Sequence, residues 1–129
     1  MGEPDDEIKR GYDVLIEVLD ALTTACRPGI PACDVHHVTS EVFNKRGLSI
    51  PPRKSAYSLG INYPPDWGEG HIMSFTETET RLLEPGMVFH IGTGLFEYPR
   101  YQLGITDTII VTDNACEVVT DFPRELVIK

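Results

Sequence analysis

The sequence predicts an α+β domain in which two helices cover one face of a mainly antiparallel, curved sheet. Two patterns carry this prediction. Apolar residues recur every three or four positions before Gly47, as in amphipathic helices, and alternate with polar residues and turn sequences after it, as in strands. The length of 129 residues suits one domain, so we expect a single unit over 1–129.

The first helix is expected over residues 5–26. The acidic sequence Asp5-Asp6-Glu7 marks its start, because the positive end of the helix dipole favours carboxylates. The sequence Arg27-Pro28-Gly29 marks its end, because proline disfavours helical backbone in the residue before it. Between these ends, apolar side chains form one stripe at positions 8, 12, 15, 19, 22 and 26.

The second helix is expected over 31–46, because proline is favourable in a first turn and Gly47 can terminate a helix. The sheet is expected over about 56–129. Its strand candidates are residues 56–61, 87–91, 103–112 and 116–120, of which the last two are joined by a turn at Asn114-Ala115.

The chain is acidic, with 20 Asp and Glu against 11 Lys and Arg and a formal net charge of −9. Nucleic-acid binding needs clustered basic side chains, so no nucleic-acid partner is expected. The sequence contains no run of 18 apolar residues and does not begin like a signal peptide, so no membrane association is expected. Three cysteines cannot all pair within the chain, which favours reduced thiols and a cytoplasmic location.

Two polar residues interrupt predicted strands and are candidates for a site. His90 lies within an apolar strand, on the face opposite Phe89, and is either a satisfied half-buried histidine or a pocket residue that acts as a general base. Asp107 lies within the longest strand, where a carboxylate needs solvent or a partner. A structural role and a role in a site both remain open for each residue.

The loop at 63–70 is a candidate for substrate binding. Its prolines exclude regular sheet, and loops of this kind on a rigid sheet commonly shape binding sites. The side chains that we expect to contact substrate are Tyr63, Asp66, Trp67 and Glu69.

Several motifs follow one another in an order and at spacings that resemble a single family. They are Arg-Pro-Gly at 27–29, AYSLGI at 56–61, YPPDWGE at 63–69, LEPGMVFH at 83–90, TDTIIVT at 106–112 and FPREL at 122–126. The chain resembles the creatinase/aminopeptidase, or pita-bread, family, which includes Xaa-Pro dipeptidases, methionine aminopeptidases, creatinase and ectoine hydrolase. The similarity is closest to the ectoine hydrolase-like branch and covers the C-terminal half of the family domain.

The resemblance implies hydrolysis of a C–N bond in a small amide or peptide. Metallopeptidases of this family hold two divalent ions with two aspartates, a histidine and two glutamates. The matching positions here carry Tyr57, Gly92 and Thr106, with Pro64 in place of a second histidine, and only a one-residue shift puts Asp107 at the last position. The two aspartates belong to the missing half. We therefore expect no metal site, no cofactor and no metallopeptidase activity of the isolated chain.

Two functional hypotheses follow from the resemblance. In the first, the protein hydrolyses its substrate without metal, as creatinase does, and Tyr57, His90 and Asp107 line the pocket, with His90 transferring the proton. In the second, the protein is a non-catalytic module that binds a peptide or protein.

The half-length match has three explanations: a fragment, a shortened gene product, or a half-domain that self-associates. We expect a homo-oligomer or association with the missing N-terminal half, because an uncovered sheet face would expose apolar area.

Overall fold

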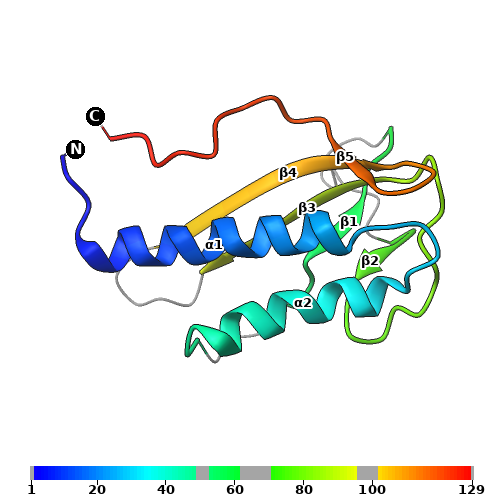
Figure 1. The fold of residues 1–129 in the computed structure, drawn as a ribbon, viewed down its shortest axis with the longest axis horizontal. Coiled ribbons are helices and arrows are strands. Elements are labelled where there is room, and N and C mark those ends of the chain that lie inside the picture. Colours follow the sequence, from blue (N-terminus) through cyan, green and yellow to red (C-terminus); the bar gives the residue numbers. More distant parts are fainter. Residues whose placement is uncertain (1, 49–52, 62–70, 96–101, 129) are drawn as a thin grey trace.

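The computed structural model describes residues 2–48, 53–61, 71–95 and 102–128. Within these ranges, two helices precede a sheet of five strands in the order β2-β1-β3-β4-β5, and every neighbouring pair is antiparallel. Figure 1 shows both helices on the same side of the sheet, which confirms the predicted arrangement. The elements are α1 (Asp6–Ala25), α2 (Ala32–Lys45), β1 (Ala56–Ser58), β2 (Ser74–Phe75), β3 (Val88–Leu95), β4 (Leu103–Val111) and β5 (Cys116–Val118).

Both helices lie where the sequence places them, and their ends have identifiable causes. The carboxylate of Asp5 caps α1 by accepting a hydrogen bond from the backbone N–H of Ile8 at 3.0 Å. Gly47 follows the end of α2 with φ +73°, a conformation that side chains larger than glycine rarely adopt. No helix in the described ranges is long and apolar enough to cross a membrane.

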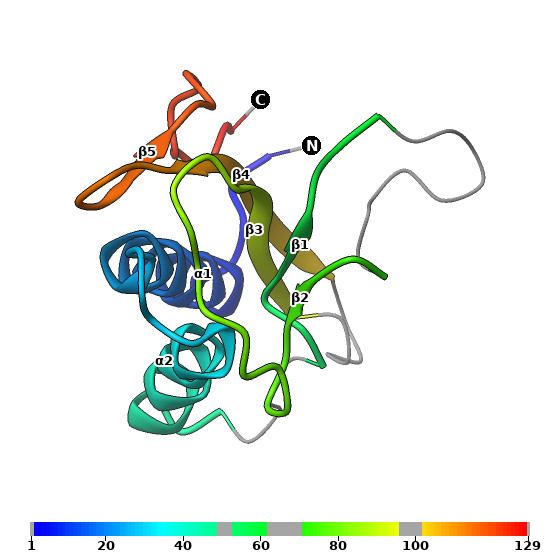
Figure 2. The ribbon, with the colours of Figure 1, turned by 90° about the vertical axis from the view of Figure 1, so that its right-hand side faces the viewer.

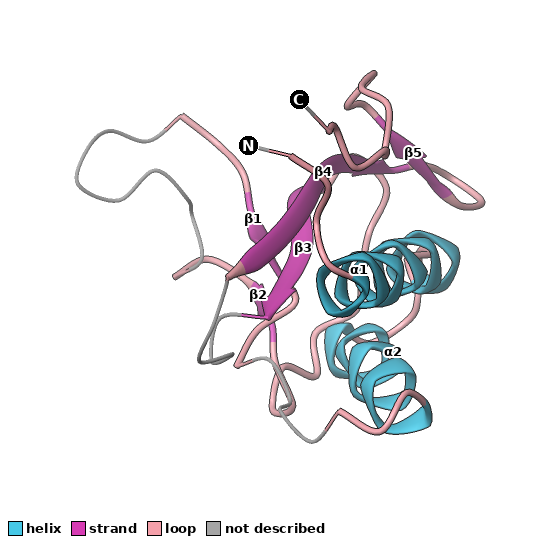
Figure 3. Ribbon diagram, turned by 90° about the vertical axis from the view of Figure 1, so that its left-hand side faces the viewer, coloured by secondary structure: helices cyan, strands magenta, loops and turns pink. Residues whose placement is uncertain are grey.

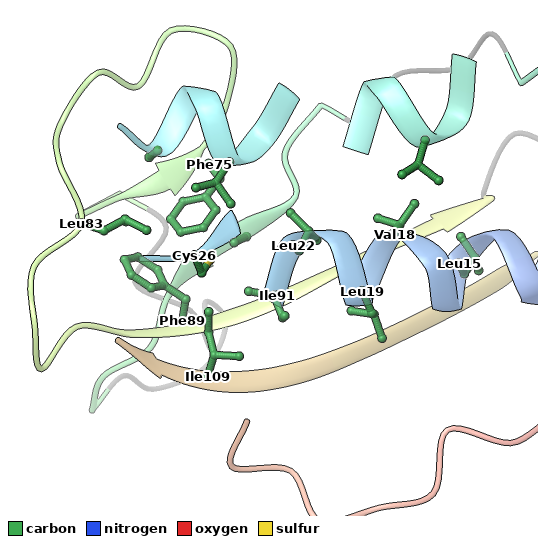
Figure 4. Close-up of a cluster of buried hydrophobic side chains, with 14 of the residues drawn as sticks. Leu15, Val18, Leu19, Leu22, Cys26, Phe75, Leu83, Phe89, Ile91 and Ile109 are labelled. Carbon is green, nitrogen blue, oxygen red and sulfur yellow. The ribbon is translucent and has the colours of Figure 1, made fainter. Parts of the chain in front are cut away.

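The hydrophobic core lies between the helices and the sheet. Leu15, Leu19 and Leu22 of α1 are fully buried on its inner stripe. Figure 4 shows side chains of this stripe meeting those of the sheet, among them Phe89 and Ile109. Burying one such side chain stabilises the fold by about 1.5–3 kcal/mol, so the contact between α1 and the sheet contributes substantially to stability.

The opposite side of the sheet is not covered by either helix (Figures 2 and 3). Alternation along β3 buries Phe89, Ile91, Thr93 and Leu95 against the helices and directs the intervening residues to the other side. We name this other side the open face. Its central residues are Tyr57 of β1, His90 and Gly92 of β3, and Thr106 and Thr108 of β4.

The open face differs from the sequence expectation of exposed apolar area. Hydroxyl, imidazole and glycine residues occupy its centre, and the apolar Val88 and Ile110 at one end are partly buried. The most exposed large apolar side chains lie outside the paired strands, at Ile61, Phe122 and Val127. The composition of the open face is therefore that of a polar site rather than of a hydrophobic interface.

The strands differ in several places from the sequence prediction, and β5, for example, ends at Val118 rather than at residue 120. β1 ends at Ser58 rather than Ile61, and the two-residue β2 was not expected. β3 continues beyond Ile91 to Leu95 through two glycines, which have low strand propensity but are accommodated by an unbroken ladder with β4. Tertiary pairing therefore overrides the local glycine signal.

Asp107 lies on the helix side of the sheet. Its ladder partner is Ile91, which is fully buried, and Asp107 itself is 4% exposed. Its Oδ2 lies 2.6 Å from Nη2 of Arg124, whose Nη1 lies 2.6 Å from Oδ1 of Asp20 on α1. The alignment at Asp107 Oδ2 is poor for a hydrogen bond, so the attraction is mainly that of opposite charges. Arg124 thereby ties the C-terminal segment to both β4 and α1.

We predict that Arg124→Gln destabilises the protein by about 2–3 kcal/mol, because it leaves a buried carboxylate without its counter-charge. Chemical denaturation would measure this loss. The double variant Asp107→Asn/Arg124→Gln should recover most of it, whereas Arg81→Gln, which breaks an exposed ion pair with Glu79, should have little effect. Equal losses for Arg124→Gln and the double variant would contradict the charge-pairing explanation.

Candidate functional site

Tyr57 and His90 form the centre of the open face. They are direct partners in the β1–β3 ladder, and their rings lie 5.0 Å apart with a 37° tilt. Burial lowers the pKa of His90 below its usual value, and the charge of Asp107 opposes this more weakly. His90 is therefore neutral at pH 7, and a neutral imidazole can accept a proton.

Hydroxyl groups extend this pair across the sheet. Ladder pairing places Ser74, Tyr57, His90 and Thr108 in one row over β2, β1, β3 and β4, with neighbouring strands about 4.7–4.9 Å apart. Such a row presents several hydrogen-bonding groups to one side of a small polar molecule.

In the next row of the open face, β4 leaves no space for a side chain on the facing residue of β3. Gly92 pairs with Thr106, and a Cβ placed on Gly92 would lie 2.5 Å from Thr106 Cγ2, 2.7 Å from the Ile105 carbonyl oxygen and 2.9 Å from Thr106 Cα. Two of these atoms belong to the backbone and cannot rotate away. Position 92 therefore accepts only glycine without a shift of the strands.

Comparison with known proteins identifies the family of this chain. A family model described as Metallopeptidase family M24 matches residues 1–113. The chain belongs to this family. Ectoine hydrolase of Halomonas elongata is 35% identical to this M24 chain over 129 residues, which are 100% of the chain and 32% of that protein.

Solved structures share the fold of this M24 chain. Dipeptidase PepE from Mycobacterium ulcerans superposes with a TM-score of 0.82 at 25% identity, covering 98% of the chain and 33% of that protein. Prolidase from Thermococcus sibiricus superposes with a TM-score of 0.83 at 24% identity, covering 98% of the chain and 33% of that protein. The chain spans about a third of the length of the relatives it matches.

The family name raises the question of whether the residues present suit a metal centre. The positions implied by the resemblance, Tyr57, Gly92 and Thr106, lie together on the open face, but they supply a phenol, no side chain and an alcohol. Hard divalent ions require convergent carboxylates. Within 2–48, 53–61, 71–95 and 102–128, no three His, Cys, Asp or Glu side chains cluster closely enough to hold an ion. These positions do not fit the family's metal pair.

The structure brings together only some of the residues expected in the site. Tyr57 and His90 lie side by side. Asp107 points to the opposite face of the sheet, where it forms an ion pair with Arg124. The hypothesis that Asp107 lines the same pocket as His90 is not supported by this geometry, because adjacent residues of a strand alternate between faces. The substrate-binding candidates Tyr63, Asp66, Trp67 and Glu69 lie outside the described residues, as does Pro64.

Sequence reasoning missed Lys54, which belongs to the same surface. Its Nζ lies 4.8 Å from the centroid of the Tyr57 ring. The signal was present as the basic pair Arg53-Lys54 ahead of β1 in an otherwise acidic chain.

A separate cavity of about 500 Å³ opens where β1 ends and β3 begins. Leu59, Met73, Met87 and Val88 give it an apolar lining, to which Arg81 and Glu84 add charges. It includes neither Tyr57 nor His90, so it does not define the candidate site.

We predict that Gly92→Ala lowers the melting temperature by several degrees, because its Cβ overlaps backbone atoms of β4. Thermal unfolding followed by circular dichroism would measure the shift. Thr106→Ser removes only the Cγ2 methyl, so the double variant Gly92→Ala/Thr106→Ser should recover part of the loss. An unchanged melting temperature for Gly92→Ala would show that the strands are not held this closely.

Proposed function

We propose that this M24 chain provides a metal-independent site that hydrolyses a C–N bond in a small amide, peptide or cyclic amidine. The observation that carries the proposal is the Tyr57–His90 pair at the centre of a polar open face. The 35% identity to an ectoine hydrolase supports the same reaction class. A cytoplasmic location is part of the proposal and is supported by the free thiols of Cys26, Cys33 and Cys116.

The proposed chemistry assigns a role to each central group. Neutral His90 accepts a proton from the attacking water as its oxygen bonds to the substrate carbon, and the resulting imidazolium then donates that proton to the departing nitrogen. The Tyr57 hydroxyl can donate a hydrogen bond to the oxygen or nitrogen on which negative charge develops. Neither the proton transfer by His90 nor the hydrogen bond from Tyr57 requires a carboxylate at positions 92 and 106, where this chain has glycine and threonine.

The open face contacts a substrate from one side only, so residues beyond the described strands are needed to enclose it. Because the chain spans about a third of its matched relatives, we propose that a further segment or a second copy of the chain covers the open face. The partner covers a polar site, so its contacts must supply hydrogen bonds as well as apolar area.

We predict that His90→Ala lowers turnover of ectoine or of an Xaa-Pro dipeptide about 10²–10⁴-fold, the usual contribution of a positioned acid–base group. His37→Ala removes an exposed histidine on α2 and serves as the matched control, with turnover unchanged. Turnover should fall only at acid pH, below the usual titration range of a histidine, because burial lowers the pKa of His90 and a protonated imidazole cannot accept a proton. It should persist after chelation.

Two outcomes would contradict the proposal of a metal-independent hydrolase. Stoichiometric divalent metal whose removal abolishes turnover would show that ligands from elsewhere complete a metal site. Binding of these compounds without turnover by the unaltered protein would favour the alternative, a non-catalytic module that recognises peptides.

We predict that the purified protein sediments as a species larger than its 14.4 kDa monomer. Analytical ultracentrifugation over a hundredfold concentration range would test association of the chain with itself. A monomer throughout the range would leave a further segment, rather than a second copy, as the cover of the open face.

A further inference from the structure

Lys54 lies beside Tyr57, one member of the Tyr57–His90 pair. The ammonium Nζ lies 4.8 Å from the centre of the Tyr57 ring, and that ring lies 5.0 Å from the ring of His90. The Tyr57 ring therefore lies close to both a cation and an imidazole.

The backbone next to Lys54 is fixed by its neighbour. Ser55 is 1% exposed, and its hydroxyl lies 3.0 Å from Nδ1 of the buried His36. The backbone N–H of Ser55 donates a hydrogen bond to the carbonyl oxygen of Phe75. The carbonyl oxygen of Ser55 accepts one from the N–H of Gly92 at 2.9 Å. The base of the Lys54 side chain is thus attached to the same β1–β3 framework that holds His90.

The charge of Lys54 is not neutralised by the residues that the structure describes. None of their carboxylates forms an ion pair with it, whereas Arg81 is paired with Glu79, and Arg124 is paired with Asp20 and Asp107. In a chain with a net charge of −9, an ammonium that lies next to the central pair and forms no ion pair with a described carboxylate is a specific feature. A substrate anion is the partner that its chemistry favours.

We propose that Lys54 binds a carboxylate of the substrate and thereby determines specificity. The favoured substrates are small amides or amidines that carry a carboxylate near the bond that is cleaved. This inference rests on the proposed function for the location of the reacting bond. The recognition step itself needs only the position of Lys54 beside Tyr57.

A binding experiment tests this without depending on turnover. Titration calorimetry would compare the dipeptide Ala-Pro with its C-terminal amide, and ectoine with its methyl ester, on the unaltered protein and on Lys54→Met. A hydrogen bond to a charged group supports an expected ten- to hundredfold loss of affinity for the carboxylate forms. The blocked forms should bind the two proteins equally, and Lys54→Arg should retain most of the affinity.

Arg53→Met is the matched control, because it removes an adjacent exposed positive charge that makes no contact with Tyr57 among the described contacts. It should leave the preference for carboxylates intact. If turnover is present, Lys54→Met should raise KM for the carboxylate substrates with little change in kcat.

The result separates this inference from the proposed function. Loss of turnover in His90→Ala with the Lys54-dependent binding preserved supports both. Lys54-dependent binding in a protein without turnover supports the carboxylate site and overturns the hydrolase. Equal affinity of the unaltered protein for free and blocked carboxylates, or equal losses on Arg53→Met and Lys54→Met, overturns the carboxylate site whatever the turnover.

Discussion

The register between β3 and β4 is the constraint on which the rest of the structure depends. Eight residues of β3 pair with eight of β4 without interruption, from Val88–Ile110 to Leu95–Leu103. This register sends Phe89, Ile91 and Ile109 into the core under α1 and leaves His90 on the other side. A slip of one residue would exchange the two faces, so the same pairing that stabilises the core also assembles the site.

The helices and the strand faces could be predicted from the sequence because each signal is local. The apolar stripe of α1, its acidic start and the proline after it all act within a few residues, as does the alternation that separates Phe89 from His90. The extent of β3 could not be predicted in this way. Glycine has a low strand propensity, so the local sequence at Gly92 and Gly94 does not predict a strand. Only pairing with the backbone of β4 explains why both residues remain in the ladder.

The candidate site could be predicted only in part, for a similar reason. His90 is conspicuous as a polar residue in an apolar strand, and Tyr57 follows from the family resemblance. Asp107 is equally conspicuous, but its role depends on Arg124, seventeen residues later, which no periodic pattern connects to it. Lys54 lies outside any strand, and its relation to Tyr57 depends on how the buried Ser55 is fixed.

The close contact at Gly92 limits which side chains this position of β3 could accept. A glutamate at this position, as the metal-binding relatives implied by the resemblance would have, must first place a Cβ where the backbone of β4 already lies. One substitution therefore costs stability before it can contribute a ligand, and a second ligand is still absent at Thr106. A carboxylate introduced at position 92 of this chain would therefore have to offset the cost of separating β3 from β4, so the close strand contact itself opposes the gain of a metal ligand there.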